Sequence, residues 1–101
     1  MIVTNFEKQP WDEQDYDIDI NPYLSEFTGD TIASAAVTLP DGVSGEVSLG
    51  TGAQDVTHQG GFVKFWVIGG TSGKKYKMTL RITTSAGRKK EYEVMVNVVD
   101  H

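Results

Sequence analysis

The strongest constraint on the fold is a strict alternation of apolar and polar side chains near the C-terminal end of the sequence. In one segment every second residue is large and apolar: Tyr76, Met78, Leu80 and Ile82. The same period returns in a second segment, at Tyr92, Val94, Val96 and Val98. Because successive side chains of a β-strand point to opposite faces of the sheet, both segments predict half-buried strands. The turn between them contains Gly87, which supplies the positive φ that a tight hairpin requires.

Other parts of the chain also predict strands. The segments are residues 15–20, 31–39, 43–49, 55–58 and 62–68. The last segment is apolar on both faces, as a central or covered strand is. Lys64 shares a face with Trp66, so we expect that face to point outward. The core face then carries Val63, Phe65 and Val67.

About seven short strands separated by turn residues predict an all-β fold, an immunoglobulin-like β-sandwich, with a small barrel as the competing architecture. Tyr76 stands two residues before Met78, in the place of the Tyr-x-Cys of immunoglobulin domains. We therefore expect the Tyr76 hydroxyl to bond to backbone, with Met78 replacing the cysteine. Asn21 followed by Pro22 predicts one helical turn near residues 22–26, with Asn21 as its N-cap.

The length of 101 residues is typical of one domain. We expect residues 1–11 to form an extended N-terminal arm that is only partly paired, and residues 12–101 to form the sandwich domain. No cysteine is present, so neither disulfides nor thiolate metal sites hold the fold. The chain has no recognisable export signal and no run of ~20 apolar residues, so we expect synthesis in the cytoplasm and no membrane partner.

The net charge of −5 disfavours nucleic acid as a partner, because binding to phosphates needs a basic surface. The charge is also unevenly distributed. Residues 1–30 carry eight acidic residues and one basic residue, whereas residues 61–101 carry eight basic and three acidic residues. In one hypothesis the acidic N-terminal strand lies beside the basic C-terminal hairpin within one molecule. In the other, the acidic edge of one copy meets the basic edge of the next in a head-to-tail assembly.

Motifs for catalysis or cofactor binding are incomplete. Four carboxylates match positions of a calcium loop of the EF-hand kind: Asp15, Asp17, Asp19 and Glu26. Ile20 stands where that loop needs glycine, and a solvated acidic strand face explains the same residues better. Residues 69–75 resemble a phosphate-binding loop, but the glycine spacing is one residue short and a strand follows instead of a helix. We therefore expect no metal, no cofactor and no enzymatic activity.

Outward-facing apolar residues are candidates for contacts with other proteins. If the valines of residues 94–98 point inward, Met95 and Val99 point outward, as Trp66 and Ile68 do on the earlier strand. The competing explanation is that residues 1–11 fold back over them. The candidate interface residues are aromatic or aliphatic anchors, cations that would face a partner's carboxylates, and carboxylates that would face a neighbouring copy: Trp11, Trp66, Ile68, Met95, Val99, Lys74, Lys75, Arg88, Lys89, Asp15, Asp17 and Asp19.

Several longer motifs resemble those of a known family. They are Phe6-Glu7-Lys8-Gln9-Pro10, Asp15-Tyr16-Asp17, Gly29-Asp30-Thr31-Ile32-Ala33-Ser34-Ala35, Leu39-Pro40-Asp41-Gly42, Phe65-Trp66-Val67-Ile68-Gly69-Gly70-Thr71-Ser72-Gly73-Lys74-Lys75-Tyr76 and Ile82-Thr83-Thr84-Ser85-Ala86-Gly87-Arg88. With these motifs the chain is similar, over nearly its whole length, to the fiber-tail adaptors of tailed bacteriophages and prophages. The resemblance implies a non-enzymatic, immunoglobulin-like virion component that works as a repeated copy in the tail or at its fiber junction.

We therefore expect a phage or prophage virion protein that is made in the host bacterial cytoplasm and contacts other tail, fiber or connector proteins. We also expect it to form a homo-oligomer in the particle. The alternative is a carbohydrate-binding or adhesive immunoglobulin-like module, whose aromatic residues stack on sugar rings. The candidates for such stacking are Trp11, Tyr16, Tyr23 and Trp66. A capsid decoration protein is a third possibility, which differs from the first in its place on the particle.

Overall fold

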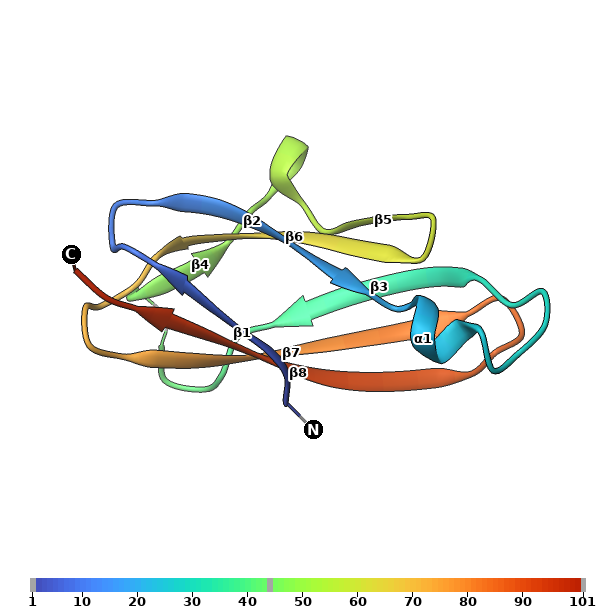
Figure 1. The fold of residues 1–101 in the computed structure, drawn as a ribbon. Helices are drawn as coiled ribbons and strands as arrows, with labels where there is room; N and C mark the ends of the chain where they lie inside the picture. The colour runs from blue at the N-terminus through green and yellow to red at the C-terminus, as the bar shows by residue number, and fades with distance from the viewer. Residues whose placement is uncertain (1, 44, 101) are drawn as a thin grey trace.

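The computed structural model describes residues 2–43 and 45–100, and within them it contains eight strands, one short α-helix and one 3₁₀ turn. The elements are β1 (Ile2–Lys8), β2 (Glu13–Asp19), α1 (Asn21–Leu24), β3 (Ile32–Thr38), β4 (Val47–Leu49), η1 (Gly52–Gln54), β5 (Thr57–Gln59), β6 (Phe62–Gly69), β7 (Lys75–Thr84) and β8 (Lys89–Val98). The strands build two facing sheets (Figure 1). One sheet has the order β1-β8-β7-β3 and the other the order β2-β6-β4, with β5 paired to the remaining half of β6.

The strand order confirms the predicted all-β sandwich. In immunoglobulin domains the second, fifth and fourth strands share one sheet, and the third, sixth and seventh share the other. Here β2, β6 and β4 follow the first pattern, and β3, β7 and β8 follow the second. β1 joins the second sheet, in parallel with β8. Two open sheets, rather than one closed barrel, therefore enclose the core.

The core is formed by the rows of side chains that alternate inward along the strands. The expected inward residues of β7 and β8 are all buried, as are Val63, Phe65 and Val67 of β6. Tyr16, Ile18 and Ile20, from β2 and the residue after it, pack into the same cluster. The two-residue period of the sequence thus places the aliphatic side chains of both sheets face to face.

Tyr76 makes the backbone contact that the sequence predicts. Its hydroxyl accepts a hydrogen bond from the N–H of Thr71 at 2.8 Å and donates one to Oε1 of Glu46 at 2.9 Å. Met78, two residues later, is fully buried, as expected for a residue in the place of the cysteine. The interaction fixes the loop from β6 to β7 against the start of β7.

Most of the segment expected to form an extended arm is the edge strand β1, residues 2–8, which pairs with β8. Phe6 stacks on Tyr16 of β2, with ring centroids 4.2 Å apart. Lys8 is only 3% exposed, and its ammonium donates to the carbonyl oxygens of Gln9, at 2.7 Å, and of Gly69. Burial lowers the pKa of Lys8, and the nearby carboxylate of Asp12 opposes this effect. Because Gly69 ends β6, Lys8 joins the end of β1 to the opposite sheet.

The strand expected at residues 43–49 is shorter in the structure, where β4 begins at Val47. The carbonyl oxygen of Val43 accepts hydrogen bonds from the N–H groups of Glu46 and Val47, at 2.9 and 3.4 Å, which close a turn. Gly45 has a φ of +88°, a left-handed conformation that interrupts a strand. The apolar alternation at these positions therefore belongs partly to a turn.

The helical turn is confirmed as α1, but the predicted cap is wrong. The N-cap is Ile20, and Asn21 is already helical. The Asn21 side chain instead donates to Oδ1 of Asp19 at 2.9 Å and to the carbonyl oxygen of Gly60 at 3.2 Å. The amide thus connects α1 to the turn between β5 and β6.

Candidate interaction surfaces

The outer face of β2 and β6 gathers half of the predicted interface residues. The register pairs Glu13 with Ile68, Asp15 with Trp66, Asp17 with Lys64 and Asp19 with Phe62. Trp11 lies beside this face, in the turn before β2, and lines a shallow pocket together with Glu13 and Ile68. We call this surface the acidic-aromatic face. It comprises Trp11, Glu13, Asp15, Asp17, Asp19, Phe62, Lys64, Trp66 and Ile68.

Negative charge is in excess on the acidic-aromatic face. Of the residues that define it, Lys64 is the one cation, and four are acidic. Nζ of Lys64 lies 3.3 Å from Oδ2 of Asp15 and 3.9 Å from Oδ1 of Asp17. All three side chains are substantially exposed, so these ion pairs contribute little to stability. Lys64 therefore lowers the repulsion among the carboxylates without neutralising the face.

The same face carries exposed aromatic residues. Trp11 is 91% exposed, and Phe62 is 44% exposed at the other end of β6. Trp66 is only partly exposed, because the segment before β5 packs against it. Gly50 lies so close that a Cβ on it would stand 2.8 Å from Cβ of Trp66. Of the two predicted tryptophan anchors, Trp11 is thus the freely accessible one.

Lys74, predicted to face a partner, is bound within the molecule. Its ammonium donates to Oε1 of Glu46 at 2.9 Å, the same oxygen that accepts from Tyr76. These two hydrogen bonds hold the pKa of Glu46 below its usual value, and the hydrogen bond to Glu46 raises the pKa of Lys74. The cluster of Glu46, Lys74 and Tyr76 at this end of the sandwich stabilises the loop from β6 to β7.

Arg88 is bound in a similar group at the opposite end. Its Nη1 lies 2.8 Å from Oδ2 of Asp30, whose side chain is 2% exposed, and its guanidinium stacks 3.9 Å from the ring centre of Phe27. Oδ1 of Asp30 also accepts from the N–H groups of Thr31 and Ala86, at 3.0 and 3.1 Å. Burial acts to raise the pKa of Asp30, but hydrogen bonds from Thr84, Ala86, Arg88 and Thr31 outweigh it and lower the pKa.

Ion pairs cross the outer face of the β7–β8 hairpin. Nε of Arg81 lies 2.7 Å from Oε1 of Glu91, and Nζ of Lys77 lies 3.9 Å from Oε1 of Glu93. The acidic strand β2 pairs with β6 in the other sheet. The hypothesis that β2 lies beside the basic hairpin is therefore wrong, and Arg81 and Lys77 pair with acids of the hairpin itself.

The remaining predicted interface residues are separated in the structure. Met95, on the outer side of β8, and Val99, the residue after β8, are partly exposed. Lys75 begins β7 and Lys89 begins β8, so they lie at opposite ends of the hairpin and are exposed. Within the described part of the chain neither forms an ion pair. The structure thus brings together the acidic and aromatic candidates but not the four cations.

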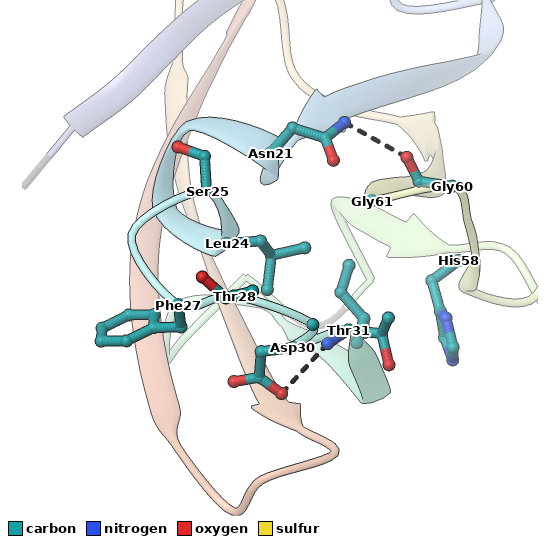
Figure 2. Close-up of a pocket in the computed structure, with 12 residues that line it drawn as sticks. Asn21, Leu24, Ser25, Phe27, Thr28, Asp30, Thr31, His58, Gly60 and Gly61 are labelled. Atoms are coloured by element: carbon teal, nitrogen blue, oxygen red, sulfur yellow. Dashed lines mark hydrogen bonds between the residues drawn. The ribbon is translucent and has the colours of Figure 1, made fainter.

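A groove of about 400 Å³ opens at the end of the sandwich that holds α1. Figure 2 shows Leu24 pointing into it, with His58 on the opposite side and the hydrogen bond from Asn21 to Gly60 above. Among residues 2–43 and 45–100, no group of three or more His, Asp or Glu side chains is placed to hold a metal ion. The groove is lined by residues of α1, of the segment that follows it and of the turn before β6.

Comparison with known proteins decides the family. A family model described as podophage GP4 fiber-tail adaptor protein gp77 matches residues 8–97. The chain belongs to this family. The match confirms the resemblance to fiber-tail adaptors and covers the sandwich from the end of β1 to the end of β8.

No curated protein matches this adaptor-family chain. Among solved structures, a 2,6-sialyltransferase of the Vibrionaceae bacterium Photobacterium sp. JT-ISH-224, in complex with CMP and lactose, aligns with a TM-score of 0.46 and 14% identity. The alignment covers 97% of this chain and 18% of that chain, so the chain spans about a fifth of the length of that protein. In the described residues, no helix has the length and apolar character that crossing a bilayer demands.

Proposed function

We propose that this protein is a non-enzymatic structural component of a phage or prophage virion. It joins tail and fiber proteins through surface contacts. The observation that carries this proposal is the match of the fiber-tail adaptor model to residues 8–97, which spans nearly every strand of the sandwich. Outward-facing aromatic and charged side chains, rather than a catalytic cleft, are the means of contact that this fold offers.

The positions of the resemblance motifs support this division between scaffold and surface. Residues 29–35 and 82–88 meet at the Asp30–Arg88 group, and residues 65–76 contain the Tyr76 corner and Lys74. These motifs hold the loops at the two ends of the sandwich. The outer faces between the ends are left to determine which proteins are bound.

We further propose that several copies act together in the particle, after synthesis in the host cytoplasm, and that neither nucleic acid nor membrane is bound. Assembly through repeated copies is consistent with polar, charge-bearing outer faces that can meet other proteins. Lys74 and Arg88 are already bound within one molecule. A head-to-tail ionic contact between copies would therefore use Lys75 or Lys89.

The test is reconstitution with the tail and fiber proteins encoded beside this chain. Each is mixed with the purified protein, and the mixture is analysed by size-exclusion chromatography with light scattering. We expect a complex of defined mass with at least one tail or fiber protein. Binding to the major capsid protein alone would instead identify a decoration protein. A monomer that binds none of these proteins would refute the adaptor function.

The exposure of Trp11 favours one second candidate, a carbohydrate-binding module. An indole that is 91% exposed next to the carboxylate of Glu13 is able to stack on a sugar ring while the carboxylate accepts hydroxyl hydrogen bonds. A glycan array distinguishes the two functions. Saturable binding that is lost in Trp11→Ala supports the carbohydrate-binding module, and an adaptor gives no saturable signal.

A further inference from the structure

We propose that the acidic-aromatic face docks a cationic protein segment that presents arginine side chains. This inference rests on the adaptor function proposed above and names the chemistry of the partner. It follows from the charge, the exposed rings and the register of β2 against β6, each of which is described above.

The charge of the face selects a basic partner. Four carboxylates alternate along one side of β2 opposite the single ammonium of Lys64. A second copy that presented the same face would be repelled, because like charges in apposition disfavour association. The outer face of the β7–β8 hairpin differs, because Arg81 pairs with Glu91, Lys77 pairs with Glu93, and the exposed Lys75 and Lys89 leave it without an excess of negative charge that would attract a basic partner.

The exposed rings favour arginine over lysine. Asp15 lies directly opposite Trp66, so a carboxylate and an indole are neighbours on the face. A guanidinium binds a carboxylate through two hydrogen bonds and stacks on an aromatic face, whereas an ammonium is a compact charge without a plane. Trp11 and Phe62 supply further exposed rings, on which a guanidinium can stack, at the two ends of the face.

The competing explanation is that the carboxylates only protect an edge strand. β2 is the outermost strand of its sheet, and charged side chains on such a strand prevent association with other strands. That role predicts aggregation when the charges are removed, and it predicts no preference among soluble cationic ligands. The experiment therefore measures binding and association in the same samples.

The first measurement uses the intrinsic fluorescence of the whole chain. Its two tryptophans, Trp11 and Trp66, both belong to the face. We expect a short peptide of alternating threonine and arginine to change this fluorescence saturably at low ionic strength. A matched peptide with lysine in place of arginine should change it less. A matched peptide with glutamate in place of arginine should have no effect. Added salt should weaken binding, because exposed charges are screened.

Paired variants test the location. Asp15→Asn with Asp17→Asn should weaken binding of the arginine peptide about tenfold. Glu26→Gln with Asp41→Asn removes the same charge from exposed positions elsewhere and should leave binding within about twofold. Equal weakening by both pairs would refute the inference, as would the absence of saturable binding. Aggregation of the first pair with unchanged peptide affinity would show that the carboxylates only guard the edge.

The tail complex separates this inference from the proposed function. If the wild-type chain binds a tail protein and the Asp15→Asn, Asp17→Asn variant binds it equally well, the inference is wrong and the adaptor function stands. If the wild-type chain binds no tail protein, the adaptor function is wrong, and the peptide titration alone decides the inference. Loss of the complex in this variant, but not in the Glu26→Gln, Asp41→Asn control, supports both.

Discussion

The two outer faces of the sandwich share the same backbone pattern but handle charge in opposite ways. On the β7–β8 face, acids and bases lie on adjacent strands of one hairpin and pair with each other. On the β2–β6 face, the acids lie on one strand and a single lysine lies on the other. The comparison indicates that Glu91 and Glu93 on the hairpin face have their cationic partners within the hairpin. The acidic-aromatic face requires counterions or a partner to balance its charge.

The inner faces of the two sheets should not differ in this way. Truncation of one core side chain on each sheet tests this point and has the largest expected effect on stability. Phe65→Ala on β6 and Leu80→Ala on β7 each remove a buried side chain, and each should lower the free energy of unfolding by about 3 kcal/mol. Urea denaturation measures both. A small effect of one substitution would show that its sheet contributes little to the common core.

The next largest effect should be the loss of stability at alkaline pH that is caused by Tyr16 on β2. Burial, with smaller contributions from Asp12 and Asp15, raises the pKa of Tyr16 from 10.0 to about 12. The unfolded chain therefore loses this proton first, and stability that is complete below pH 10 is lost as the pH rises toward about 12. Denaturation of the wild type and Tyr16→Phe over this range measures the contribution. A constant difference between the two proteins would contradict the buried position of Tyr16.

Tyr76→Phe should have a smaller effect on stability and should not distinguish the two outer faces. The substitution removes the acceptor for Thr71 and the donor for Glu46, and it should cost about 1 kcal/mol. Urea denaturation gives the stability. Binding of the arginine peptide should be unchanged, because Asp15 and Asp17, opposite Trp66 and Lys64, lie farther from this corner than Ile68 does. A change in peptide affinity would mean that the end cluster also controls the face.

Removal of single cations on the two outer faces should have the smallest effect. Arg81→Met and Lys64→Met each break exposed ion pairs and should change stability by about 0.5 kcal/mol or less. Their effects on binding should differ, since Lys64→Met makes the acidic-aromatic face more negative and Arg81→Met leaves it unchanged. Tighter binding of the arginine peptide by Lys64→Met alone is the expected outcome. Equal affinities would show that the contrast between the faces has no consequence for binding.

The sequence predicts the parts of this fold that depend on local periodicity. Alternation identifies the inward rows of β7 and β8, and the Tyr76–Met78 spacing identifies the corner. The contact of Asp30 with Arg88 joins residues far apart in the chain, and no periodic pattern indicates which carboxylate an arginine will select. The burial of Lys8 does not follow from residue type, because lysine is rarely buried, although its spacing from Phe6 places both on the inner face.

For the candidate interaction surface, the sequence indicates which strand residues point outward but does not indicate which cations are bound within the chain. The outward positions of Asp15, Asp17 and Ile68 follow from the two-residue period. Glu13 and Phe62 share that parity and belong to the same face, but they were not among the predicted interface residues. Lys74 and Arg88 were predicted as free cations, because only the folded chain brings Glu46 and Asp30 against them.

The parallel pairing of β1 with β8 has a mechanical consequence. The chain enters the first of these strands at one end and leaves the second at the other, so tension applied to the two termini pulls the strands past each other. The hydrogen bonds of the ladder then bear the load together instead of opening in succession. The ammonium of Lys8, held by the carbonyl oxygens of Gln9 and Gly69, also fastens the end of β1 to the opposite sheet. A sandwich connected in this way transmits force along its long axis without first unravelling from an edge.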